Sequence, residues 1–162
     1  MLGAALVLTS VLVETTVVTR LPLPGTAPDL ALVVVIAFAF VEGPMSGMVT
    51  GFAAGLLADL LADHQLGRLA LAYAAVGYVT GLTKDDTERS TVAPFLAVGL
   101  GAVTALVLFT VEGLLLADPR VTVAALGMSL FSAVSYDVVL TPFVVPVVGL
   151  LLRRVEQDAV RR

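Results

Sequence analysis

Apolar runs without a charged residue are the feature that most restricts how this chain can fold. Hydrophobic residues make up 59% of its 162 residues and charged residues only 14%, and the mean hydropathy is +1.04. A soluble domain of this size does not carry so large an apolar fraction. The sequence therefore predicts an integral membrane protein. The charge-free runs are 1–13, 30–41, 43–58, 69–83, 90–111, 121–136 and 138–152.

Turn residues and charges between these runs indicate six helical elements. Only the run 90–111 reaches the roughly 20 residues that cross a bilayer unaided. The other helices must extend into their flanking residues, or the bilayer must thin locally. Gly43 and Pro44 predict a tight hairpin, because glycine suits a helix end and proline suits the first position of the next helix. We expect an all-α polytopic membrane protein, a six-helix bundle, with helices at about 2–19, 29–42, 44–62, 66–83, 91–116 and 122–152.

The last element is too long to cross as one straight helix. A continuous helix over 122–152 would measure about 45 Å, against about 30 Å for the hydrocarbon core. We therefore predict a helix break near 137–142, at Asp137 and Pro142, with 122–136 lying along the interface or packing obliquely.

The basic residues predict the orientation in the membrane. The apolar start, 1–13, has no basic segment before it, so we interpret it as a retained first span and not as a signal peptide. We expect a multi-pass protein of the plasma membrane with six crossings and a basic cytoplasmic tail at 153–162. Both termini are expected in the cytoplasm, because six basic residues then lie inside and three outside. The inside residues are Lys84, Arg89, Arg153, Arg154, Arg161 and Arg162, and the outside residues are Arg20, Arg68 and Arg120.

The stretch GMVTGFAAGLLADLLAD, residues 47–63, places three glycines and an aspartate at four-residue spacing. Positions four apart drift by only about 40° around a helix, so Gly47, Gly51, Gly55 and Asp59 share one face. Small residues on one face allow close helix packing, either within the chain or against a partner. Gly77 and Gly81 repeat the pattern on the following helix.

Asp59 lies in the last turn of its helix, where its charge opposes the helix dipole. We expect it to anchor the loop that enters the next helix at Leu66 and Gly67, through backbone N–H groups or Arg68. A proton or ion route is the alternative role for a carboxylate in a membrane helix. Glu14, which also interrupts an apolar run, is expected to face the headgroups.

The sequence contains no recognisable catalytic or cofactor-binding pattern. Without cysteine there is no thiol nucleophile, and no phosphate loop, nucleophile elbow or metalloprotease helix occurs. His64 with Asp59 and Asp63 forms only a weak set of metal ligands. We therefore expect no catalytic residue, no metal, no cofactor and no nucleic-acid binding.

Residues 28–81 resemble the rod shape-determining protein MreD family. The shared features are a Pro-Asp start to the second helix, a Gly-Pro hairpin, a glycine-rich third helix ending in Asp-Leu, and Leu-Gly before the fourth helix. They fall on Pro28, Asp29, Gly43, Pro44, Gly47, Gly51, Gly55, Asp59, Leu60, Leu66 and Gly67.

The resemblance implies a non-enzymatic component of the bacterial elongation machinery. Such a protein assembles with MreC and helps connect MreB filaments and the elongation peptidoglycan synthase, in contact with membrane lipids. The resemblance also implies a fold similar to the substrate-binding subunits of energy-coupling-factor vitamin transporters, so a vitamin carrier is the main alternative. The Ala-xxx-Ala motif usual in the first helix of those subunits is absent from residues 1–19. An ion-coupled transporter is a third class, for which only Asp137 beside a proline is suggestive.

Overall fold

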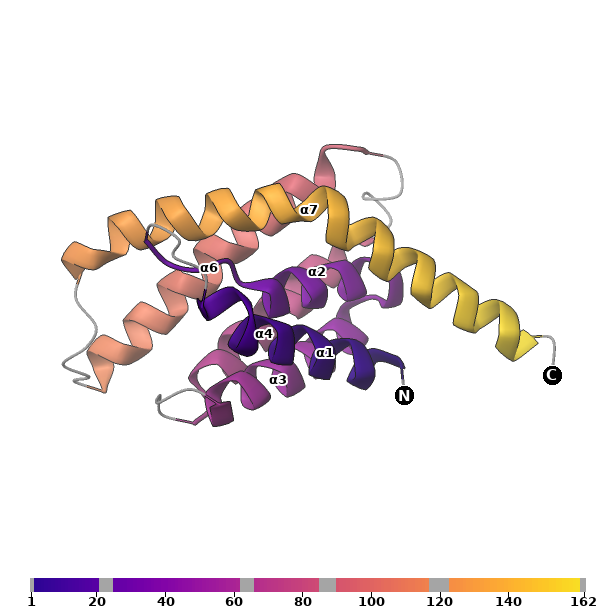
Figure 1. The fold of residues 1–162 in the computed structure, drawn as a ribbon, viewed down its shortest axis with the longest axis horizontal. Helices are drawn as coiled ribbons and strands as arrows, with labels where there is room; N and C mark the ends of the chain where they lie inside the picture. Colours follow the sequence, from indigo (N-terminus) through magenta and orange to yellow (C-terminus); the bar gives the residue numbers. More distant parts are fainter. Residues whose placement is uncertain (1, 21–24, 62–65, 85–89, 117–122, 161–162) are drawn as a thin grey trace.

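The chain folds into helices alone throughout its described part (Figure 1). The computed structural model describes the backbone of residues 2–20, 25–61, 66–84, 90–116 and 123–160. Six α-helices and one short 3-10 helix occur in these residues. They are α1 (Leu2–Thr16), η1 (Val18–Arg20), α2 (Leu30–Glu42), α3 (Pro44–Leu61), α4 (Arg68–Leu82), α6 (Ala93–Leu115) and α7 (Val123–Val160).

The helix ends follow local chemistry. Asp29 caps α2, because its side chain accepts a hydrogen bond from the Leu32 N–H. Gly43 ends α2 with a φ of 91°, and Pro44 opens α3 at once. The fourth helix begins at Arg68 and not at residue 66, because Gly67 before it adopts the left-handed conformation with φ 101°. The first helix ends at Thr16, short of the expected residue 19, and the chain continues as η1.

The predicted break near Asp137 and Pro142 is wrong. α7 is one continuous helix of 38 residues that contains both Pro142 and Pro146, and it bends midway along its length (Figure 1). A full break would leave several backbone groups without partners in an apolar surrounding, whereas a bend loses only the bonds that proline cannot make. The Thr141 hydroxyl donates to the Asp137 carbonyl at 2.9 Å, a contact that favours bending. The helix also continues to Val160, so most of the predicted tail 153–162 is helical.

α2 is the central helix of the bundle. It packs against α1, α3, α4, α6 and α7, and every residue from Ala31 to Phe40 is buried. A helix that is apolar on all sides is stable only when other elements surround it. Its neighbours contribute small residues at the contacts: a Cβ added at Gly101 of α6 would lie 2.6 Å from Ile36, and one added at Gly3 of α1 would lie 3.0 Å from Phe38.

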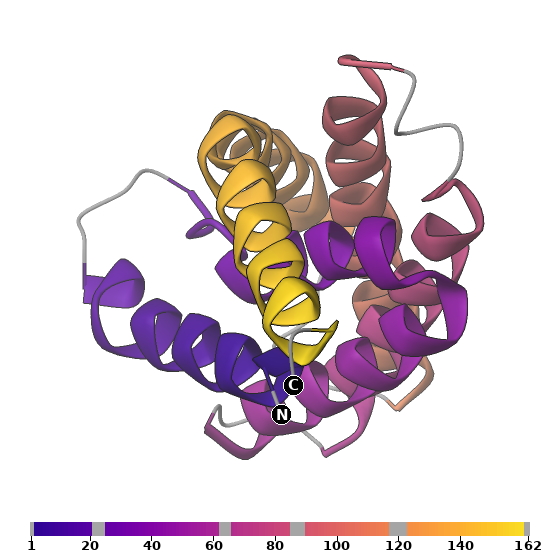
Figure 2. The same cartoon turned by 90° about the vertical axis from the view of Figure 1, so that its right-hand side faces the viewer.

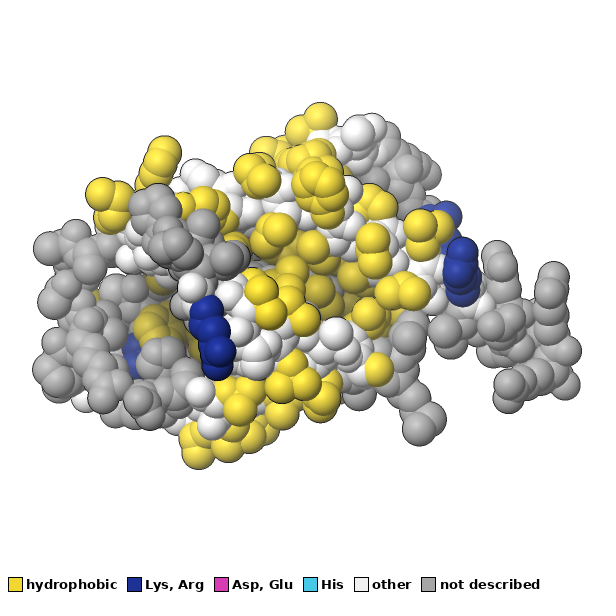
Figure 3. Space-filling view, viewed as in Figure 1, with side chains coloured by type: hydrophobic (Ala, Val, Ile, Leu, Met, Phe, Trp, Pro, Cys, Tyr) yellow, Lys and Arg dark blue, Asp and Glu magenta, His cyan; other side chains and the backbone are white. Residues whose placement is uncertain are grey.

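Three described helices are long and apolar enough to cross a membrane, namely Pro44–Leu61, Ala93–Leu115 and the Gly127–Arg154 part of α7. The visible face in Figure 3 has hydrophobic side chains over its middle and Lys or Arg toward its two ends. Both chain ends lie toward the right of Figure 1, and both face the viewer in Figure 2. These features fit a membrane protein whose apolar sides face lipid.

Candidate functional site

The glycine row of α3 lies against α4. A Cβ at Gly47 would be 2.5 Å from the Gly77 carbonyl oxygen, and a Cβ at Gly51 would be 2.7 Å from the Tyr73 carbonyl carbon. Both distances are shorter than real Cβ contacts, so only glycine lets the two backbones approach so closely. Gly55 meets the backbone of Leu69 in the same way. The row is therefore occupied by a contact inside the chain.

The Gly-Pro hairpin belongs to the same contact. A Cβ at Gly81, near the end of α4, would lie 2.5 Å from the Pro44 nitrogen and 2.6 Å from the Gly43 carbonyl carbon. The hairpin and the glycine row therefore form one close α3–α4 contact from Gly43 to Gly55.

Asp59 supplies the cap that α4 lacks. Gly67 precedes α4 and offers no side chain, and the buried Asp59 carboxylate accepts from the N–H groups of Gly67 at 2.8 Å, Leu69 at 3.1 Å and Ala70 at 3.4 Å. These N–H groups have no partner within the helix, and an acceptor also suits the positive end of its dipole. The carboxylate thereby joins the end of α3 to the start of α4. Leu66 is 65% exposed and stays outside this network, and Asp63 and His64 lie outside the described residues.

Arg68 joins α4 to α6. The side chain is buried, donates to the Phe109 carbonyl at 2.8 Å, and lies 3.9 Å from the centre of the Phe109 ring. A guanidinium over an aromatic face is favourable, more so away from water. An outer-side positive charge expected from the sequence is thus part of the packed interior.

A second set of carboxylates surrounds the start of α2. Asp29 accepts from its own helix at Leu32, Glu14 of α1 accepts from the Ala31 N–H at 2.9 Å, and Asp137 of α7 accepts from the Asp29 N–H at 2.7 Å. α2 starts beside a cavity, with Asp29 and Leu30 partly exposed, and the first N–H groups of a helix need acceptors from outside the helix. Three elements distant in sequence therefore supply the acceptors.

The prediction that Glu14 faces the headgroups is wrong. Glu14 is half-buried and its Oε2 is bonded to the backbone of α2. The physical reason is that the first N–H groups of α2 need acceptors from outside the helix, and Glu14 of α1 lies close enough to supply one.

Tyr73 completes this acidic cluster, which we define as Glu14, Asp29, Tyr73 and Asp137. The Tyr73 hydroxyl donates to Asp29 Oδ2, and the buried Oδ2 of Asp137 has no hydrogen-bond partner among the described residues. All four residues line a cavity of about 320 Å³ whose other walls are mostly apolar side chains. Pro28 also lines it, so the Pro-Asp start of α2 forms part of the cavity wall. In the described part of the chain, no three or more His, Cys, Asp or Glu residues form a group that could hold a metal ion.

Sequence reasoning missed Glu14 and Tyr73 as members of this cluster, and it assigned Asp137 to a helix break. The sequence did contain a signal for Glu14 and Asp137, because each of them interrupts an apolar run. The sequence did not show that both bind the start of α2, because Glu14 lies 17 residues from its partner Ala31, and Asp137 lies 108 residues from its partner Asp29. The sequence-predicted residues thus divide into two groups: Asp59 with the glycines at the α3–α4 contact, and Asp29 with Asp137 at the start of α2.

A family model described as rod shape-determining protein MreD matches residues 1–155, almost the whole chain. A search of the curated proteins finds no match. The family is a structural component that determines cell shape and is not known as an enzyme. With the matched span covering every helix from α1 to most of α7, the chain belongs to the rod shape-determining protein MreD family.

Proposed function

We propose that this chain is a non-enzymatic membrane component of the bacterial cell-elongation complex. It controls cell shape by assembling with the single-span protein MreC, and it links cytoplasmic MreB to peptidoglycan synthesis. The observation that carries this proposal is the family match over residues 1–155. Turnover of a peptidoglycan precursor, lipid or nucleotide by the purified protein alone would contradict the non-enzymatic part.

The proposed topology has six crossings of the plasma membrane with both termini in the cytoplasm. It is supported by the position of both chain ends on one side of the bundle (Figures 1 and 2), and by the six-to-three distribution of basic residues. Reporters fused after Arg162 and within 84–89 should both give a cytoplasmic signal. A periplasmic signal from either fusion contradicts the topology.

The α3–α4 contact is proposed to set the shape that MreC recognises. The glycine row is used inside the chain, so a partner helix meets the outward residues of these helices, such as Met45, Val49 and Phe52 of α3, all more than half exposed. Close packing of the glycines and the Asp59 cap determine where those outward residues lie. The site residues therefore act on the partner indirectly.

The test is co-purification with MreC, scored beside membrane abundance and rod shape, for Gly51→Leu, Asp59→Asn and Asp59→Leu. Gly51→Leu should separate α3 from α4, because the new side chain would overlap the Tyr73 backbone. Asn can still accept hydrogen bonds and Leu cannot, so Asp59→Asn should be the milder change. Gly127→Leu is the matched control, because a Cβ at Gly127 meets nothing within 4 Å.

Three outcomes separate the roles. Loss of MreC from Gly51→Leu and Asp59→Leu, with Asp59→Asn close to the parent, supports the structural role. Full abundance, partner binding and normal rods in all three variants contradict the assignment of this site. Failure of Asp59→Asn alone replaces the structural role with one that depends on a proton at Asp59.

A vitamin carrier is the second candidate, favoured by one observation. The cavity of about 320 Å³ beside the acidic cluster has an apolar wall and a few convergent polar groups, which is usual for small-molecule sites. Mass spectrometry of small molecules that co-elute with the native protein separates the two functions. The carrier would be favoured by a stoichiometric vitamin-like ligand that is lost in Ala105→Phe, because the larger side chain would occupy the cavity. If no such ligand co-elutes with the protein, the assembly role is favoured.

A further inference from the structure

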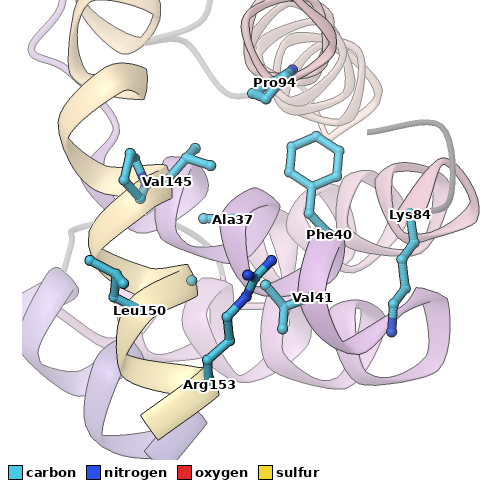
Figure 4. Close-up of a pocket in the computed structure, with 10 residues that line it drawn as sticks. Ala37, Phe40, Val41, Lys84, Pro94, Val145, Leu150 and Arg153 are labelled. Atoms are coloured by element: carbon cyan, nitrogen blue, oxygen red, sulfur yellow. The ribbon is translucent and has the colours of Figure 1, made fainter. Parts of the chain in front are cut away.

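A groove opens at the end of α2 opposite the acidic cluster (Figure 4). It has a volume of about 990 Å³ and lies between α2, the start of α6 and the second half of α7. Most of its lining side chains are apolar: Phe40 and Val41 of α2, Val145 and Leu150 of α7, and Pro94 at the start of α6. Leu150 is 61% exposed, so the groove is continuous with the apolar outer surface of α7.

Two cations border this groove. Arg153 reaches in from α7, and Lys84, just beyond α4, lies on the opposite side (Figure 4). None of the described residues that line the groove is a carboxylate. Within the part of the chain that the structure describes, neither cation takes part in an ion pair or hydrogen bond. Among the described residues, the groove therefore combines mostly apolar side chains with two cations that have no described acidic partner.

We propose that this groove binds an anionic phospholipid, with the phosphate between Lys84 and Arg153 and an acyl chain against Phe40, Val145 and Leu150. Basic residues at the ends of membrane helices attract anionic headgroups, and apolar grooves between helices accommodate acyl chains. The proposal depends on the chain being a membrane protein and not on MreC, so either proposal can fail without the other.

The chemistry of the groove favours this occupant over a soluble anion or an acidic protein segment. A free phosphate would contact only the two cations, whereas the acyl chain of a phospholipid also packs against the apolar side chains of the groove. An acidic peptide would have to bury polar backbone against those walls. A phospholipid satisfies the charged mouth and the apolar wall with one molecule.

The charge test measures lipid retained per chain after purification from mixed phosphatidylglycerol and phosphatidylethanolamine, read by native mass spectrometry. Lys84→Gln and Arg153→Gln should each lower the preference for phosphatidylglycerol about fivefold, and the double variant roughly 25-fold. Arg154→Gln is the matched control, because it removes the same charge from the neighbouring residue, which does not line the groove. It should leave the preference near that of the parent.

The shape test fills the groove without changing a charge. Gly149 lines the groove, and a Cβ at this position meets nothing within 4 Å. Gly149→Leu should therefore fold normally and reduce retained phosphatidylglycerol by at least fivefold. Gly127→Leu, an equally open glycine of the same helix that does not line the groove, should retain the lipid.

Five results would overturn the proposal. Four concern the lipid: an unchanged lipid preference in the double variant, an equal loss in Arg154→Gln, lipid retention in Gly149→Leu, and displacement of the lipid by millimolar inorganic phosphate. The last result would identify the ligand as a free anion. Capture of an acidic segment of MreC at these cations, in place of lipid, would likewise reassign the groove to a protein partner.

Discussion

The two ends of α2 differ in the charged residues around them: carboxylates surround its start, and cations lie near its end. At its start, Glu14, Asp29 and Asp137 are directed inward and bonded to backbone N–H groups beside a cavity of about 320 Å³. At its other end, Lys84 and Arg153 border a groove of about 990 Å³ and have no ion-pair partner among the described residues. The first set of charges is bonded to the backbone of the fold, and the second is the set that we propose binds a lipid headgroup.

The difference arises from what each helix end requires. The start of a helix has free N–H groups that need acceptors, and at α2 the three carboxylates supply them. At the end of α2 the groups without intrahelical partners are carbonyls, and the Gly43 N–H donates to one of them, that of Ala39, at 2.9 Å. A helix start that needs acceptors favours nearby carboxylates, whereas a helix end that presents carbonyl groups favours nearby cations.

Asp29→Ala should have the largest effect on stability, because it removes the acceptor of both Leu32 N–H and the Tyr73 hydroxyl. Two buried donors would be left unsatisfied, which costs about 3 kcal/mol in the free energy of unfolding. Glu42→Ala at the exposed end of α2 is the control and should change it by less than about 0.5 kcal/mol. Denaturation in detergent micelles, followed by loss of helicity, measures both; equal effects would mean that the two ends do not differ.

Asp137→Leu should come next, with a loss of about 2 kcal/mol, because the Asp29 N–H then has no acceptor. Asp137→Asn keeps an oxygen that can accept this bond, so its loss should stay below about 1 kcal/mol. The same denaturation measurement compares them. If Asn destabilises as much as Leu, the unpartnered Oδ2 has a role of its own, and the cluster is more than a helix cap.

Tyr73→Phe should cost about 1 kcal/mol, because it removes one hydrogen bond to Asp29 while the Leu32 N–H bond remains. Tyr78→Phe, on the same helix but 40% exposed, should be close to neutral. An unfolding midpoint for Tyr73→Phe that equals that of Tyr78→Phe would remove Tyr73 from the acidic cluster.

The double variant Lys84→Gln with Arg153→Gln should have the smallest effect. Neither cation is paired with a described residue, so the free energy of unfolding in lipid-free detergent should change by less than about 0.5 kcal/mol. A loss above about 1 kcal/mol, measured in the same way, would show that these cations serve the fold, as the carboxylates at the other end do.

Local features of the fold were predictable because their causes are local. The Gly43–Pro44 hairpin, the Asp29 start of α2 and the four-residue glycine spacing each depend on neighbouring residues. The expected break at Asp137 and Pro142 was wrong for the opposite reason, because α7 stays continuous by packing against α6 and α2. A proline signals a lost hydrogen bond, and the surrounding helices decide whether the helix then ends or bends.

The amino-acid sequence was sufficient to predict a helical membrane protein and most of its helix ends, because apolar runs and capping residues act over a few positions. It did not predict that α2 is central, that Glu14 and Asp137 meet at the start of α2, or that Lys84 and Arg153 line one groove. These outcomes depend on contacts between segments far apart in the chain. A buried charged side chain is stable only where it can bond a partner group, and the positions of such groups are set by how the helices pack in the bundle.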